Sequence, residues 1–198
     1  MFYSIARAIG KPIFFFLIHP VVEGKENISQ EGAYVLAGNH TKWLDPLLMI
    51  GTNKRKIHFL AKIELFHGII GFVVKHMGAI PVDRKKHDKD ALIHAKEALK
   101  QGEVIGIFPE GTINRTKDVT MPFKIGAVKM AFDTNTKIVP FTITGKYKIF
   151  RKEIKITYLE PITIKGDLEK ENERLRKIIE KNLIKEGKIN EKRENARI

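Results

Sequence analysis

The chain has 198 residues, and its 36 Lys and Arg against 23 Asp and Glu give a formal net charge of +13. Hydrophobic residues make up 43 %, which excludes a disordered chain, and the length suits one α/β domain. Cysteine is absent, which excludes a disulfide framework, a Cys-ligated zinc site and a thiol nucleophile. The charge predicts attraction to an anionic partner, although a lysine-rich surface that only aids solubility explains it equally well.

The first 20 residues predict a helical segment. Phe2, Ile5, Ala6 and Ile9 recur at helical spacing, and residues 12–22 (PIFFFLIHPVV) are mostly apolar. That run falls short of the ~20 apolar residues of a spanning helix. No small-residue cleavage site follows it, which argues against a secretory signal. A core helix and an amphipathic helix in the membrane interface both fit the pattern, and three consecutive Phe residues favour the interface.

The remaining elements are predicted in chain order from residue 34 onward. Strands are expected at 34–37, 56–61, 79–82, 104–108, 138–144 and 154–159. Helices are expected at 45–50, 68–76, 88–101 and 123–132, with a charged C-terminal helix from 168 that ends at Gly187. Short strands alternating with helices predict an α/β fold with a single mixed, partly parallel sheet covered by helices. The expected organisation is a membrane-interface helical segment at 1–20, a domain at 21–187 and a frayed tail at 188–198.

Several kinds of chemistry are unsupported by the sequence. Serine occurs only at Ser4 and Ser29, and neither lies in a nucleophile elbow, so we expect no covalent acyl-enzyme. The phosphate-binding pattern G-x-x-x-x-G-K-[ST], the dinucleotide-binding pattern G-x-G-x-x-G and the zinc pattern H-E-x-x-H are absent. The sequence therefore predicts neither P-loop nucleotide cleavage nor zincin chemistry.

The segment GNHTKWLDP, residues 38–46, follows a predicted buried strand and precedes a predicted helix. Ligands bind at this position in open α/β sheets. His40 and Asp45 can meet across the turn, where the carboxylate fixes the imidazole tautomer and leaves the other ring nitrogen to accept a proton. The alternative is that Asp45 only caps the helix and His40 is a satisfied turn residue.

Three further clusters follow predicted strands. Arg84 ends the stretch GAIPVDR and can present a guanidinium fork to a phosphate, or it can pair with Asp83 on the surface. Glu110 lies in FPEGT, where it can accept hydrogen bonds from a polyol, anchor an Arg or simply be exposed in a turn. The fourth cluster, IVPF at 138–141, is by itself only a strand.

Together the four clusters resemble the glycerolipid acyltransferase family, which includes 1-acyl-glycerol-3-phosphate acyltransferase. The family pattern is N-H-x-x-x-x-D, then G-x-I-x-x-D-R, then F-P-E-G-T, then V-P. The matching residues are Asn39, His40 and Asp45; Gly78, Ile80, Asp83 and Arg84; residues 108–112; and Val139 with Pro140. The stretch AKIEL at 61–65 is also similar to the family. The likeness covers roughly residues 20–145. The family usually places an Arg directly after the Thr, where this chain has Ile113 and then Arg115.

The resemblance implies transfer of a fatty acyl group from acyl-CoA or acyl carrier protein to the free hydroxyl of 1-acyl-glycerol-3-phosphate. The product would be phosphatidic acid, in phospholipid biosynthesis. His40 would be the general base, Asp45 would orient it, and Arg84 would bind the acceptor phosphate. The other implied substrate-binding residues are Lys62, Glu110, Gly111, Thr112, Arg115 and Lys124.

No metal or cofactor is implied beyond the acyl thioester co-substrate. The expected partners are the lysophospholipid acceptor, the thioester donor and a membrane surface, with the protein peripheral or monotopic on the cytoplasmic face of the cell membrane. Another lysolipid or glycerol 3-phosphate is the alternative acceptor. A protein that binds anionic lipid or nucleic acid without catalysis is the alternative from another class. The sequence contains no nucleic-acid-binding motif, so no nucleic acid is expected as a partner.

Overall fold

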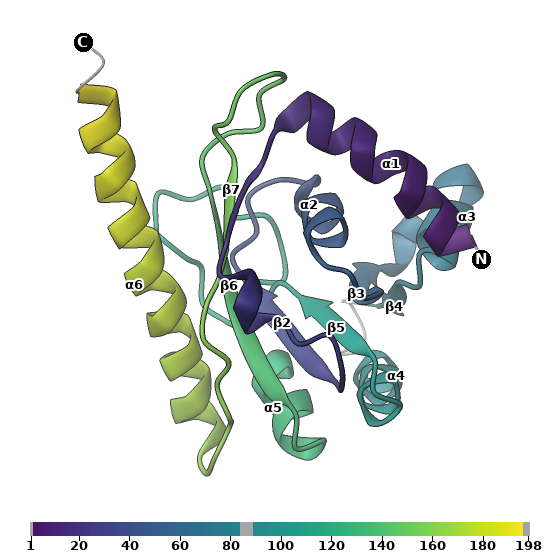
Figure 1. Ribbon diagram of the computed structural model, residues 1–198. Coiled ribbons are helices and arrows are strands. Elements are labelled where there is room, and N and C mark those ends of the chain that lie inside the picture. The colour runs from purple at the N-terminus through teal and green to yellow at the C-terminus, as the bar shows by residue number, and fades with distance from the viewer. Residues whose placement is uncertain (1, 84–88, 196–198) are drawn as a thin grey trace.

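A computed structural model describes residues 2–83 and 89–195. A seven-stranded sheet forms its centre, in the order β1-β7-β6-β2-β5-β3-β4 (Figure 1). The strands are β1 (Val21–Glu23), β2 (Tyr34–Gly38), β3 (Ile57–Lys62), β4 (Ile80–Val82), β5 (Val104–Ile107), β6 (Lys137–Thr144) and β7 (Lys155–Tyr158). Neighbouring strands are parallel except β6 and β7, which pair antiparallel. The predicted mixed, partly parallel sheet is therefore confirmed.

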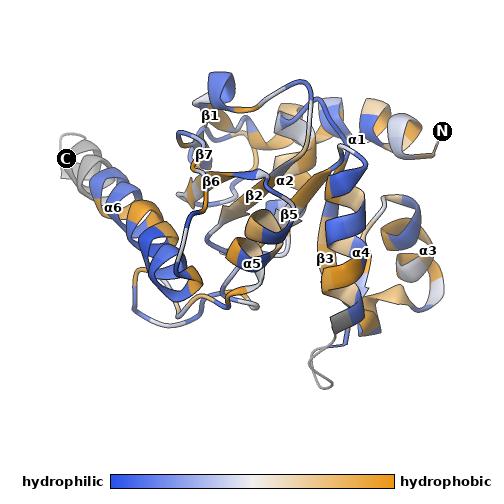
Figure 2. Ribbon diagram, turned by 90° about the horizontal axis from the view of Figure 1, so that it is seen from below, coloured by the Kyte–Doolittle hydropathy of each residue, from blue (hydrophilic) through white to orange (hydrophobic). Residues whose placement is uncertain are grey.

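Helices cover both faces of this sheet (Figure 1). They are α1 (Phe2–Ile18), α2 (Asp45–Thr52), α3 (Gly68–His76), α4 (Lys89–Lys100), α5 (Gly126–Asp133) and α6 (Leu168–Asn195), with short 3₁₀ turns at η1 (Lys25–Asn27) and η2 (Ile63–Phe66). Helices α1 and α2 lie on one face, and α4, α5 and α6 lie on the other. Figure 2 shows hydrophobic strands between these layers, while α6 is mostly hydrophilic with a hydrophobic stripe.

The core has two halves because β2 is buried on both faces. Tyr34 and Leu36 pack with α1 and α2, whereas Val35 and Ala37 pack with α4, α5 and α6. Successive strand side chains point to opposite faces, so a continuous apolar run is what a central parallel strand requires. This explains why YVLA carries no polar alternation, and it fixes the strand that leads into GNHTKWLDP.

The predicted strands and helices are present, with three corrections. Strand β1 was not predicted, because three residues are too few to show a pattern. Helix α5 begins at Gly126 rather than at residue 123. The expectation that Gly187 ends the C-terminal helix is wrong: α6 continues to Asn195, so residues 188–195 are helical rather than a frayed tail. Residues 196–198 lie outside the described residues.

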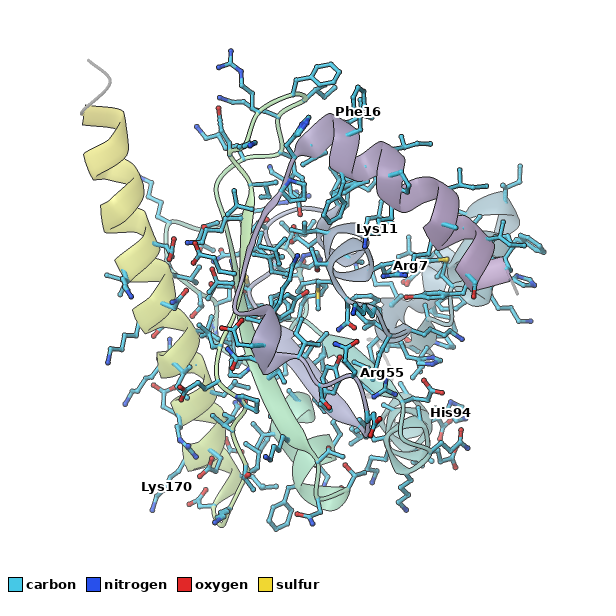
Figure 3. All side chains as sticks on the ribbon, viewed as in Figure 1. Arg7, Lys11, Phe16, Arg55, His94 and Lys170 are labelled. Carbon is cyan, nitrogen blue, oxygen red and sulfur yellow. The ribbon has the colours of Figure 1, made fainter. Side chains whose placement is uncertain are left out.

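Helix α1 has two different faces. Tyr3, Phe14 and Leu17 pack against the core, while a second set of apolar side chains is exposed. Figure 3 shows Phe16 pointing away from the body of the protein, and Arg7 and Lys11 pointing beneath the helix. Arg7 donates hydrogen bonds to backbone carbonyls at the end of α2. Within residues 2–83 and 89–195, no helix combines the length and apolar character needed to cross a bilayer.

Substitution of one glycine in β2 and one in α6 tests the packing of β2 and the continuity of α6. A Cβ on Gly38 would collide with the backbone carbonyl and ring of Phe141, whereas a Cβ on Gly187 would meet nothing within 4 Å. We expect Gly38→Ala to cost about 1–3 kcal/mol or more through overpacking. Gly187→Ala should instead stabilise a continuous helix by up to about 1 kcal/mol.

Thermal unfolding checks both substitutions. For a chain of this size each kcal/mol moves Tm by roughly 2–4 °C, so Gly38→Ala should lower Tm and Gly187→Ala should raise it slightly. A fall in Tm for Gly187→Ala would contradict a helix that runs through this position.

Candidate active site

A cavity of about 680 Å³ lies outside the carboxyl ends of the parallel strands. Residues at or just beyond the ends of four strands contribute to its wall. They are His40 after β2, Lys62 at the end of β3, Asp83 after β4 and Phe108 after β5. Three of the sequence clusters therefore converge on one space, although they are far apart in the chain. Because parallel strands end at the same edge of the sheet, this convergence follows from the topology.

His40 and Asp45 form the predicted pair. Nδ1 of His40 lies 2.8 Å from Oδ2 of Asp45, and the Asp45 side chain is fully buried. With the carboxylate accepting from Nδ1–H, Nε2 of the ring is left as an acceptor. His40 is itself part of the cavity wall. The pair therefore has the arrangement of a general base with an orienting carboxylate.

The Asp45 carboxylate accepts five hydrogen bonds in total. Oδ2 also accepts the backbone N–H groups of Thr41 (2.6 Å) and Lys42 (2.8 Å). Oδ1 accepts the hydroxyls of Thr41 (3.0 Å) and Tyr147 (2.7 Å). None of these donors belongs to the first turn of α2, and over the described residues α2 has no side-chain cap. The alternative that Asp45 only caps the helix is therefore wrong.

The backbone and ring of His40 are fixed from three sides. Asn39 pairs its side-chain amide with both backbone groups of Ile143, at 2.9 and 2.8 Å, which attaches the loop to β6. The backbone N–H of His40 donates to Oε1 of Glu110 at 3.0 Å. The imidazole stacks on the ring of Phe108, with centroids 4.0 Å apart and planes 14° apart. The plane of the base is thus set before any substrate arrives.

Glu110 lies behind His40. It is buried, and its two carboxylate oxygens accept the backbone N–H groups of His40 and Met121 (2.8 Å). Burial raises the pKa of this carboxyl, while the two N–H donors oppose that rise. In the part of the chain that the structure describes, Glu110 is not part of the cavity wall. Its geometry supports a bracing role between loops; direct contact with the acceptor stays a prediction.

Five other predicted residues contribute to the cavity wall, and Gly111 is one of them. Lys62 and Arg115 are exposed at the wall, and Lys124 reaches it from the segment before α5. Among the described residues, no hydrogen bond or ion pair engages the side chains of these three cations. Thr112 lines the same space. The cavity therefore presents a group of available positive charges.

Gly111 explains how Lys124 comes so close. Its φ of +72° favours glycine, and a Cβ at this position would lie 3.0 Å from Cε of Lys124 and 3.1 Å from its Nζ. Ile113 and Arg115 both line the cavity. Arg84 lies outside the described residues, and Asp83, directly before it in the chain, lines the cavity.

Tyr147 is the site residue that the sequence did not predict. It lies in the loop after β6, 102 positions from Asp45, and no motif marks it. Burial and the negative charge of Asp45 raise the pKa of Tyr147 far above its ordinary value, so the phenol stays a hydrogen-bond donor. Within the described residues, no three His, Asp or Glu side chains are grouped as metal ligands.

Comparison with known proteins agrees with this geometry. The family model described as "Acyltransferase" matches residues 19–144. A "1-acyl-sn-glycerol-3-phosphate acyltransferase" of Bacillus subtilis is 35 % identical over 147 residues, covering 71 % of this chain and 72 % of that one. The chain belongs to the acyltransferase family. The matched residues include the His40–Asp45 pair, the residues of the cavity wall and strand β6, and they end three residues before Tyr147.

Two further relatives define the extent of the likeness. A protein of the same name from Borreliella burgdorferi is 38 % identical over 137 residues, which is 68 % of this chain and 54 % of that one. The chain thus spans about half the length of this relative. The crystal structure of the 1-acyl-sn-glycerophosphate acyltransferase PlsC of Thermotoga maritima superposes with a TM-score of 0.75, covering 92 % of this chain and 78 % of that one. At 23 % identity this superposition confirms the α/β fold alone.

Proposed function

We propose that this acyltransferase moves a fatty acyl group from an acyl thioester to the free hydroxyl of 1-acyl-glycerol-3-phosphate. The observation that carries the proposal is the His40–Asp45 pair, 2.8 Å apart, at the wall of a cavity that also holds Lys62, Arg115 and Lys124. The names of the relatives from Bacillus subtilis and Borreliella burgdorferi support the same reaction. Acyl-CoA and acyl carrier protein are the two candidate donors.

The chemistry assigns one proton path. Nε2 of His40 accepts the proton of the acceptor hydroxyl as its oxygen attacks the thioester carbonyl. The C–O bond forms, the C–S bond breaks, and the imidazolium returns its proton to the departing thiolate. Asp45 stabilises the imidazolium and holds its tautomer. General-base catalysis of this kind supplies about 10²–10⁴-fold, and holding both substrates together supplies much of the remainder.

The cavity wall suits both parts of a lysophospholipid acceptor. Its apolar members are mostly aliphatic and aromatic, among them Phe59, Leu92 and Met130. Arg115, Lys124 and Lys62 supply positive charge in the same space. An acyl chain fits the first group, and a phosphate fits the second because charge-assisted hydrogen bonds to phosphate are strong.

Substitution of the pair tests the reaction. We expect His40→Ala to abolish acyl transfer and Asp45→Asn to lower kcat by about 10²-fold or more, because the tautomer and charge of the base are lost. Thiol release from acyl-CoA in the presence of the acceptor measures both. The control is His94→Ala, an exposed histidine on α4 that does not line the cavity (Figure 3).

Circular dichroism must show that each variant remains folded. Near-normal turnover in folded His40→Ala would refute the mechanism, and loss of turnover in His94→Ala would show that the assay reports something other than this site.

Arg115 and Lys124 test the phosphate assignment. A lost charge-assisted hydrogen bond of ~1.5–3 kcal/mol corresponds to roughly ten- to a hundredfold in kcat/KM. We expect Arg115→Ala and Lys124→Ala to raise KM for 1-acyl-glycerol-3-phosphate and to leave KM for the donor unchanged. The control is Lys117→Ala, an exposed residue of the same loop that does not line the cavity.

A silent result for both substitutions would move the phosphate to Arg84 and Lys62. If Arg84→Ala and Lys62→Ala are silent as well, a non-phosphorylated lysolipid becomes the better acceptor.

The outer face of α1 and the adjoining α3 support docking on a membrane surface. Ile5, Ile9, Ile13 and Phe16 are more than half exposed along α1, and Ile69 on α3 is 87 % exposed. The two helices meet where the rings of Phe2 and Phe72 lie 5.7 Å apart. We infer that this surface, together with the net charge of +13, binds anionic bilayers peripherally. Placement on the cytoplasmic face stays a prediction.

Vesicle flotation tests the docking surface. Ile9→Ser combined with Phe16→Ser removes two apolar side chains worth about 1.5–3 kcal/mol each when fully buried. We expect binding to phosphatidylglycerol and phosphatidylethanolamine vesicles to fall at least roughly tenfold. Phe132→Ser, on α5 at the opposite face of the sheet, is the control and should bind as the unaltered protein does. Equal binding by the double variant would exclude α1 as the docking element.

A further inference from the structure

The hydrogen bonds to Asp45 differ in where their donors come from. His40, Thr41 and Lys42 all lie within five residues of Asp45 and belong to the same loop. These local donors hold the carboxylate within its own loop, which is attached to β6 through Asn39. Among the described residues, the hydroxyl of Tyr147 is the one donor to this carboxylate from a distant segment, at 2.7 Å.

The loop that carries Tyr147 is itself anchored on α1. The rings of Phe14 and Tyr147 meet edge to face, with centroids 6.5 Å apart. Further along the loop, the backbone N–H of Phe150 donates to the carbonyl of Leu17 at 2.6 Å, and the Phe150 ring meets that of Phe16 at 5.6 Å. Tyr147 therefore joins the carboxylate of the catalytic pair to the N-terminal helix.

We propose that Tyr147 is a positioning residue that fixes the Asp45 carboxylate and thereby sets how strongly His40 holds a proton. The proposal rests on the acyl-transfer function argued above. Oδ1 accepts only Thr41 and Tyr147 among the described residues. Without the phenol, more negative charge remains on the carboxylate, and Oδ2 then holds the proton of Nδ1 more strongly.

Tyr147→Phe removes one hydroxyl and leaves the other titratable and charged groups near His40 and Asp45 in the sequence. Asp45 faces His40 and Tyr147, and the His40 backbone faces Glu110 from the loop after β5. Helix α1 contributes the apolar ring of Phe14. The remaining charged residues of the cavity that His40 lines are Lys62, Asp83, Arg115 and Lys124. A change in pH dependence after the substitution would therefore trace to the phenol.

Tyr147→Phe is the direct test. In the pH profile of kcat/KM, we expect the acidic limb to move to higher pH by about half a pH unit or more. The reason is that His40 then binds its proton more strongly. At neutral pH a half-unit movement should lower kcat by up to about threefold, with KM for both substrates changed by less than about twofold. In the Asp45→Asn background the same substitution should change kcat by less than about twofold, because the partner charge is already absent.

The matched control is Tyr158→Phe. Tyr158 is also buried on this side of the sheet, but its hydroxyl pairs with Thr52 at 2.6 Å and not with the site. Loss of this hydroxyl should lower Tm and leave the pH profile unchanged. If Tyr147 were merely structural, Tyr147→Phe would behave in the same way, and that result would overturn the proposal.

A second measurement keeps the test valid even if Tyr147→Phe folds poorly. Replacing the four tyrosines by 3-fluorotyrosine makes each phenol a stronger donor without removing it. The acidic limb should then move to lower pH, and an unchanged or opposite movement would count against the proposal. A protein that transfers no acyl group before any substitution would refute the proposed function instead, which separates the two failures.

Discussion

The site depends on one contact, the 2.8 Å hydrogen bond between Nδ1 of His40 and the buried carboxylate of Asp45. A buried carboxylate is tolerated only when its oxygens are satisfied, and this one accepts five hydrogen bonds. The donors hold the carboxylate in one orientation and so hold the imidazole in one tautomer. The rest of the loop, from Asn39 at β6 to the stack on Phe108, keeps that orientation fixed against the sheet.

A second hydrogen bond of Asp45, from Tyr147, connects the pair with the surface that we propose for membrane docking. Tyr147 reaches Asp45 from a loop that also contacts α1, the helix that exposes an apolar stripe. A lipid acceptor resides in the bilayer, so the helix that would meet the bilayer and the cavity that would receive the acceptor belong to one packed unit. On that proposal, the cations of the cavity and the net positive charge would act on the same anionic surface.

The sequence predicted most of the fold because strands such as β2 and β5 are apolar runs that stop at Gly38 and before Pro109. It predicted His40 and Asp45 because they lie five residues apart in one loop, and a local pattern can report a local contact. Tyr147 could not be predicted in this way, because its partner lies 102 residues away and a lone tyrosine has no motif. The predicted helix end at Gly187 was wrong because glycine is common just after a helix, whereas α6 continues through this glycine. The sequence could not predict that Glu110 is buried, because its partners are backbone N–H groups of His40 and Met121, which only the folded chain brings close.

We propose that acyl transfer is direct, with His40 as base and no covalent intermediate. It is tested by mixing the protein with a radiolabelled acyl thioester in the absence of any acceptor, then quenching and measuring label on the protein. We predict no bound label and no thiol release until 1-acyl-glycerol-3-phosphate is added, after which thiol and acylated product appear in equal amounts. Labelled protein in stoichiometric yield before the acceptor is added would contradict it.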